Sequence, residues 1–182
     1  MAAKTFGTDK FVQVVGRSCN QTAGAAPNNQ QIVFGLSILD KVGVLIHRVD
    51  FDVEWSPALP AAPNMGKLVY GISAVAMQTQ VEVENDNNPA WIVRRTVFDS
   101  INNGGAAVGE ARHFLQTEVA DFSMLPGGAV ITPPSTVFLT GWLIAGASPV
   151  STTVRARIYY TIAELSTEDY WQLVEARRMI PQ

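Results

Sequence analysis

The stretch HRVDFDVEW, residues 47–55, is the part of the chain that indicates its fold most clearly. Its odd positions carry His, Val, Phe, Val and Trp, while its even positions carry Arg, Asp, Asp and Glu. An alternation of period two places successive side chains on opposite faces of a β-strand. The stretch, extended back to residue 44, therefore predicts a strand with one face on a core and one charged face.

Other strand-like runs lie on both sides of this stretch and are separated by segments rich in Gly, Pro and Asn. The run 153–163 alternates as strictly as the first. No strand–helix–strand alternation is present, and many short strands at even spacing are typical of sandwiches and jelly rolls. We therefore expect an all-β fold, an antiparallel jelly-roll sandwich of about eight strands. The remaining expected strands are 11–15, 31–39, 68–83 (as one long strand or two), 91–98, 112–122, 130–134 and 136–144. The expected loops and turns are 16–30, 56–66, 84–89, 99–109, 125–128 and 145–149.

The tail of the chain has a helical pattern. Ser166 suits the N-cap position, Glu168 and Asp169 fall in the first turn, and Arg177 and Arg178 fall in the last turn. Acidic residues at the start and basic residues at the end suit the helix dipole. We expect a short C-terminal helix.

These elements predict three parts of the chain. Residues 1–30 are expected to form an N-terminal arm with one short strand and a polar loop. Residues 31–165 are expected to form the jelly-roll β-sandwich, and residues 166–182 the C-terminal helix and tail.

The composition favours a surface that neighbours cover. Charged residues make up 16% of the 182 residues, against about 25% in typical soluble domains. The net charge is −3 and the first thirty residues carry only Lys4, Lys10 and Arg17 as cations, so strong direct nucleic-acid binding is not expected. No apolar run approaches the ~20 residues that span a bilayer, and the N-terminus lacks a signal-peptide layout. Synthesis in a cytoplasm is the expectation.

The chain offers little for catalysis or metal binding. Zinc sites combine three or four His, Cys or acidic ligands at close spacing, whereas His47, His113 and Cys19 lie far apart in the sequence. We interpret the two histidines as core or edge residues and the cysteine as part of a polar loop. No catalytic, cofactor or metal site is expected.

The charged face of the first strand predicts cross-strand ion pairs. Asp50 and Asp52 lie on that face, and Arg155 and Arg157 lie on the polar face of the last strand. The first and last core strands of a jelly roll are antiparallel neighbours, and opposite charges on facing strands stabilise by roughly 0.2–1 kcal/mol per pair. We expect Arg155 or Arg157 near Asp50 or Asp52.

The C-terminal helix is the expected place for a subunit interface. Tyr170 can face the sandwich while Trp171, one residue further, points about 100° away from it. Aromatic and Arg side chains are enriched among interface hot spots. Tyr170, Trp171, Arg177 and Arg178 are the interface candidates, although Trp171 packed on its own domain is an equal alternative.

Three segments carry a resemblance to a known family: residues 47–55, LPGGAVITPPSTVFLTGW at 125–142, and RARIYYTIAELSTEDYWQLVEARR at 155–178. In their order they resemble the single jelly-roll major capsid (coat) proteins of tailless icosahedral viruses of bacteria and archaea. The resemblance covers the chain from about residue 40 onward. It implies a structural protein whose partners are copies of itself in pentameric or hexameric capsomers.

The resemblance implies a location in the capsid of the virion after synthesis in the host cytoplasm. A second coat or penton protein and an underlying viral membrane stay open as further partners. The alternative function is a carbohydrate- or receptor-binding sandwich module or a capsid decoration protein. That alternative predicts a discrete concave patch with exposed aromatic residues, whereas a coat subunit predicts apolar loop and edge surfaces.

Overall fold

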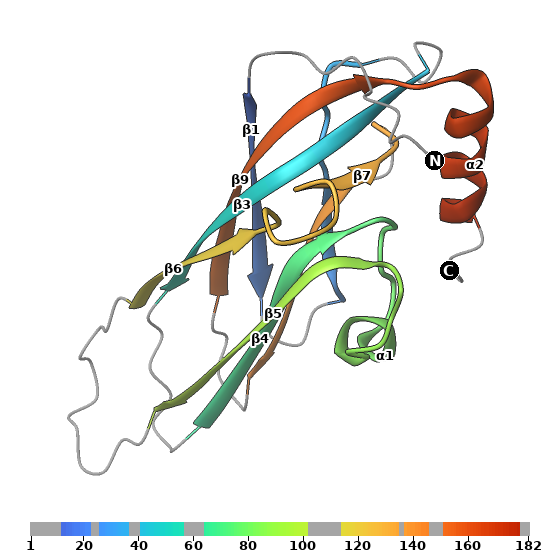
Figure 1. Cartoon of the computed structure of the whole chain (residues 1–182). Helices are drawn as coiled ribbons and strands as arrows, with labels where there is room; N and C mark the ends of the chain where they lie inside the picture. Colours follow the sequence, from blue (N-terminus) through green and yellow to red (C-terminus); the bar gives the residue numbers. More distant parts are fainter. Residues whose placement is uncertain are drawn as a thin grey trace.

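Two antiparallel sheets face each other, and two helices lie outside them (Figure 1). The computed structural model describes residues 12–22, 26–36, 41–56, 64–101, 114–134, 137–145 and 151–178. The expected all-β sandwich with a short C-terminal helix is confirmed. Its elements are β1 Gln13–Thr22, β2 Asn28–Gln31, β3 Val42–Ser56, β4 Asn64–Ser73, α1 Gln80–Glu84, β5 Trp91–Ile101, β6 Phe114–Asp121, β7 Val130–Thr132, β8 Phe138–Ala145, β9 Ser151–Glu164 and α2 Thr167–Arg178.

The order of the strands is that of a jelly roll. Sheet A runs β1-β9-β3-β6, with the short β7 added to β3, and sheet B runs β2-β8-β4-β5. All neighbouring strands pair antiparallel. The chain passes back and forth between the two sheets, as in a double Greek key. The stretch quoted above is therefore the third strand, and β1 is the first.

A β-bulge in β3 sets which side chains reach the core. The pairing of β3 with β9 shifts register between Ile46 and Arg48. Val44 and Ile46 are buried before the bulge, and the buried positions after it are Val49, Phe51 and Val53. An extra residue in one strand reverses which positions face inward. His47 is that residue, and its carbonyl accepts a hydrogen bond from the Phe122 amide at 2.9 Å.

The core fills the space between the two sheets. Phe51 of β3 and Tyr70 of β4 meet edge to face with ring centroids 5.3 Å apart. Ile158 of β9 and Leu139 of β8 are also buried there. Each fully buried side chain of this kind contributes about 1.5–3 kcal/mol, so this layer supplies most of the apolar stabilisation.

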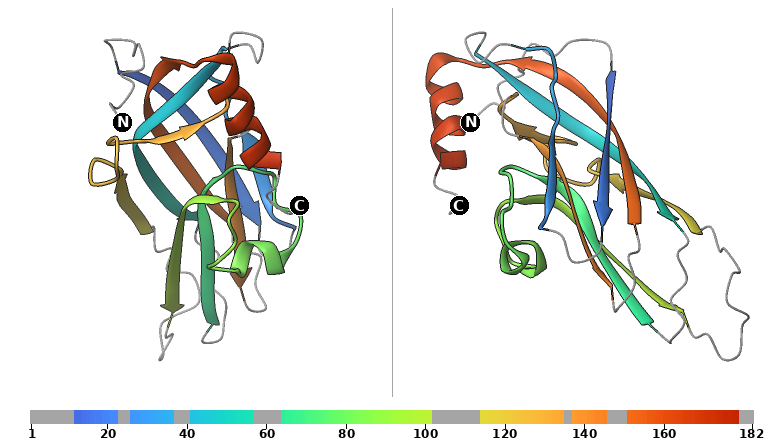
Figure 2. Two further views of the ribbon diagram at one scale, coloured as in Figure 1. Left: turned by 45° about the vertical axis from the view of Figure 1, so that its right-hand side comes forward. Right: turned by 180° about the vertical axis from the view of Figure 1, so that it is seen from behind.

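A second apolar cluster covers the outer face of sheet B. Val69 and Trp142 point outward from β4 and β8 and pack with Met77, Val83 and Ala90 from the connection between β4 and β5. This connection contains α1, which lies against the sheet (Figure 2). Sheet B is therefore apolar on both faces, whereas sheet A carries the charged outer face.

The N-terminal part of the chain differs from the expectation. Residues 13–22 and 28–31 form β1 and β2, one strand at the edge of each sheet, rather than an arm with a short strand and a loop. Cys19 is buried in β1, not placed in a loop. These edge strands have small and polar residues, because most of their side chains face solvent, and so they lack an apolar pattern.

Two further expectations were wrong. A strand was expected over residues 31–39, but β2 already ends at Gln31. Ile32 and Phe34, which follow it, are nevertheless buried. The run 68–83 is not strand throughout, since β4 ends at Ser73 and α1 follows. The expected glycine-rich loop 99–109 lies mostly outside the described residues, as does His113.

Candidate interaction surfaces

The structure brings the four residues of the expected ion-pairing face together on the outside of sheet A. Arg157 Nη2 lies 3.1 Å from Asp52 Oδ2, and Arg155 Nη2 lies 2.7 Å from Glu54 Oε2. Asp50 pairs instead with Arg48 of its own strand, Nε to Oδ1 at 2.5 Å. The arginines of β9 thus reach diagonally, because Asp50 lies opposite Arg157 and Asp52 lies opposite Arg155 in the register.

A groove runs beside these pairs at the β1 edge of sheet A. Its volume is about 650 Å³. We call it the basic groove, since its lining contains three arginines and one carboxylate. The residues that define it are Gly16, Arg17, Ser18, Gln30, Asp52, Arg155, Ala156 and Arg157.

Large apolar side chains are exposed at several separate places of the sandwich. One exposed valine lies just before β1 and a second near the start of that strand, and two apolar residues follow each other in the turn after β6. Single ones lie after β2, on α1, on β6 and on α2. The set is Val12, Val14, Val33, Val81, Val119, Met124, Leu125 and Trp171.

The interface candidates on α2 divide between two faces of the helix. Tyr170 is buried, with 3% of its surface exposed, whereas Trp171 is 54% exposed. The two rings meet edge to face at 6.0 Å. Arg177 and Arg178 lie in the last turn of α2, and their side chains are outside the described residues. Of the interface candidates whose side chains are described, Trp171 is therefore the one that α2 exposes to solvent.

The start of α2 is fixed as its sequence suggests. The Asp169 amide donates a hydrogen bond to Ser166 Oγ at 3.1 Å. Ser166 thus caps the helix. Figures 1 and 2 show α2 beyond the end of β9, on the same side of the sandwich as α1. The cap fixes where the helix turns away from the sheet and so where Trp171 points.

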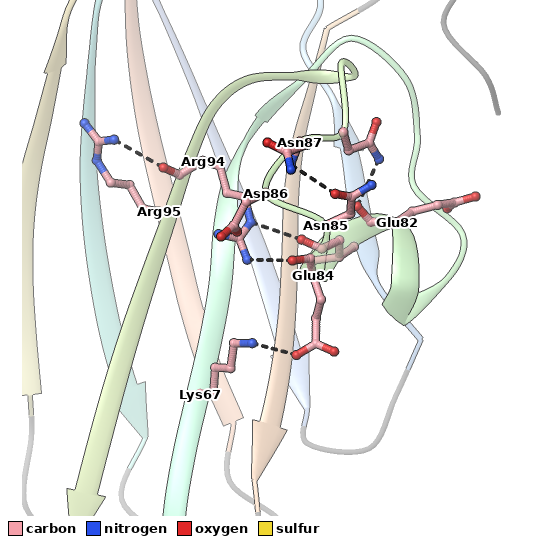
Figure 3. A network of polar contacts seen from close by, with 10 residues as sticks. Lys67, Glu82, Glu84, Asn85, Asp86, Asn87, Arg94 and Arg95 are labelled. Atoms are coloured by element: carbon pink, nitrogen blue, oxygen red, sulfur yellow. Dashed lines mark hydrogen bonds and ion pairs between the residues drawn. The ribbon is translucent and has the colours of Figure 1, made fainter.

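Arg94 braces α1 from the neighbouring strand (Figure 3). Its Nε and Nη2 donate to the Val83 and Glu84 carbonyls at 3.1 and 3.3 Å, at the C-terminal end of the helix, and its Nη1 pairs with Asp86. Lys67 Nζ lies 2.6 Å from Glu84 Oε1, and this contact lowers the pKa of Glu84. These charged groups hold the connection that contains α1 against strands β4 and β5.

His47 and Cys19 both have structural partners. Gly128 O can only accept, so His47 Nδ1 donates to it at 3.2 Å, and Nε2 shares a hydrogen bond of 2.8 Å with the Thr161 hydroxyl. Burial raises the pKa of the Cys19 thiol to about 12. Across the described ranges, no group of three or more His, Cys, Asp or Glu residues is placed to hold a metal ion.

No helix in the part of the chain that the structure describes is long and apolar enough to cross a membrane. No protein-family model matches the chain, and no curated protein is significantly similar to it.

Proposed function

We propose that this chain is a structural coat subunit that assembles with copies of itself into a viral capsid shell. The observation that carries the proposal is the distribution of exposed apolar side chains over several sides of a jelly roll. A subunit in a closed shell contacts neighbours on more than one side. A binding module needs only one such surface.

The grouping of these side chains adds to this support. Single exposed apolar residues are ordinary on protein surfaces. Here Val12, just before β1, and Val14, near its start, are two residues apart, and Met124 and Leu125 are consecutive, with Met124 93% exposed. Together with the low charged fraction of 16%, they favour a surface that loses water on association.

The lining of the basic groove favours the coat over the alternative function. A carbohydrate- or receptor-binding module, or a decoration protein, is expected to have a concave patch with exposed aromatic rings. The residues described around the basic groove are instead charged, polar or small. The most exposed aromatic ring described, Trp171, lies on a convex helix.

The test is the mass and shape of the purified protein, measured by light scattering and negative-stain microscopy. Rings, pentamers, hexamers or closed shells are the expected result. A stable monomer at high concentration, unchanged by salt and pH, would contradict the proposal and favour the binding module. Co-purification of a second coat or penton protein, or of a membrane beneath the shell, would extend the list of partners.

A variant pair localises the contact. Trp171→Ala is expected to weaken association by at least ~2 kcal/mol, the loss typical of an aromatic hot spot, while the subunit stays folded with only a small fall in its urea midpoint, because the half-exposed ring contacts Tyr170 alone among aromatic rings. Gln172→Ala is the matched control, since Gln172 is the next residue of α2 and is also exposed. Equal association of the two variants would remove Trp171 from the interface.

A further inference from the structure

The basic groove contains two arginines whose positions are fixed by carboxylates. Arg157 forms an ion pair with Asp52 through its Nη2, and Arg155 forms one with Glu54 through its Nη2. A guanidinium has five N–H donors, so most donors of both residues have no protein partner among the described residues. Their side chains are 57% and 49% exposed. The ion pairs therefore orient donors that remain free for a ligand.

The space beside these arginines is open because β1 has small residues there. Gly16 lies opposite Arg157, and Ser18 lies opposite Arg155. A Cβ built on Gly16 would come within 4 Å of only one atom, the Ala156 carbonyl oxygen at 3.8 Å. The groove is thus open above Gly16, and a larger side chain at this position would occupy the space beside the two arginines, since its Cβ meets no close atom.

The size and charge of the groove indicate the ligand. Arg155 and Arg157 are two residues apart on one face of a strand, so their Cα atoms are roughly 7 Å apart. Both side chains can therefore reach one phosphate or two linked phosphates. The groove has an excess of one positive charge. Its three arginines face two carboxylates, Asp52 in the lining and Glu54 beside it. A volume of about 650 Å³ is in the range of small-ligand pockets.

We propose that the basic groove binds a small phosphate-bearing ligand through Arg155 and Arg157. Guanidinium groups bind phosphate through paired, charge-assisted hydrogen bonds. The excess of one positive charge predicts modest affinity that falls as salt rises, since exposed charges are screened. The proposal does not depend on assembly, because all the groove residues belong to one chain.

The experiment is calorimetric titration of the full chain with inorganic pyrophosphate at low salt. Saturable binding is expected, and Arg155→Gln or Arg157→Gln is expected to weaken it about tenfold, the loss of one hydrogen bond between charged groups. Gly16→Leu is expected to weaken it at least as much, by filling the groove while every charge is kept. Circular dichroism of each variant shows that it is folded.

The matched control is Lys41→Gln. Lys41 is an exposed cation whose Nζ contacts Thr167 Oγ1 at 3.1 Å. It lies just before Val42, at one end of the β3–β9 pairing, whereas Arg155 lies near the other end. This variant loses the same single charge and is expected to bind pyrophosphate as the wild type does. Three results would overturn the proposal: no saturable binding, equal weakening by Lys41→Gln, or full binding by Gly16→Leu.

A single-stranded oligonucleotide titrated in parallel separates a small ligand from a nucleic acid. The groove is expected to bind pyrophosphate at least as tightly as it binds the oligonucleotide per phosphate. Oligonucleotide binding by the wild type and by Gly16→Leu alike, with no saturable pyrophosphate binding by the wild type, would place the phosphate contacts elsewhere and refute the small-ligand site.

Discussion

Replacing Gly71 with alanine would put a methyl group where sheet B has no room for one. Gly71 lies in β4, which is hydrogen-bonded to β8 on one side and to β5 on the other. A Cβ at this position would lie 2.0 Å from the Val93 carbonyl oxygen of β5. Ordinary van der Waals contact begins at 3.4 Å, so the two strands must separate locally by about 1.4 Å, the difference between these distances.

That displacement determines the expected cost. Paired strands lie about 4.7–4.9 Å apart, and a further separation of this size lengthens N–H···O contacts beyond hydrogen-bonding range. Loss of about two ladder bonds, with buried groups left unpaired, costs about 3–5 kcal/mol. For a chain of this length the melting temperature should fall by roughly 6–20 °C.

The assay is urea unfolding followed by circular dichroism, with Gly16→Ala as the matched control. Gly16 is also a strand glycine, but its Cβ would meet only Ala156 O at 3.8 Å, so alanine there should be neutral or stabilising by about 0.5–1 kcal/mol. If Gly71→Ala and Gly16→Ala unfolded at the same urea concentration, the close approach of β4 and β5 would be refuted.

Three further expectations follow from the polar and titratable groups. Because burial raises the pKa of Cys19 to about 12, a thiol reagent at pH 8 should label the native chain far more slowly than the urea-unfolded chain; equal rates would contradict its burial. Lys67 lowers the pKa of Glu84 in the folded chain, so this pair stabilises the fold at pH values above the ordinary Glu pKa. That stability is lost as the pH falls through the lowered pKa of the folded state. Glu84→Gln should therefore flatten the acid side of a plot of unfolding free energy against pH, and an unchanged plot would rule the contact out. Arg94→Gln should raise amide hydrogen exchange in α1 selectively, because the helix loses the partner of two terminal carbonyls, whereas uniform exchange would show that the brace is absent.

The strands with a strong apolar alternation were predictable, whereas most of β1 and nearly all of β2 were not. Alternate described side chains are buried in β3 after its bulge and in β9 up to Tyr160, so period two appears in their sequences. β1 and β2 lie at the sheet edges and have mainly small or polar residues, which resemble a loop. A signal for the bulge was present, since Val44 and Ile46 are at even positions while Val49 and Phe51 are at odd ones.

The short helix α1 also had a signal in the sequence. Thr79 and Glu82 form a capping box, in which the Glu82 amide donates to Thr79 Oγ1 and the Thr79 amide donates to a Glu82 carboxylate oxygen. This spacing is typical of a helix N-terminus. The apolar residues around it were interpreted as strand because they pack on the outer face of sheet B, and nothing local in the sequence reveals that second apolar layer.

The basic groove was beyond prediction because it depends on pairing between distant segments. The arginines of β9 were expected to meet acids of β3, yet the open side of the groove comes from Gly16 in a segment interpreted as loop.

The pairing of β1 with β9 also places the groove beside one of the exposed apolar sites. Val14 lies two residues from Gly16 on the same face of β1, whereas Trp171 lies on α2, beyond the far end of β9. A subunit that packed on Val14 would border the basic groove and compete with its ligand, while one that packed on Trp171 would not. Pyrophosphate that dissociates an assembly would therefore place one of its interfaces at the β1 edge, whereas an assembly indifferent to pyrophosphate would exclude an interface that covers the groove.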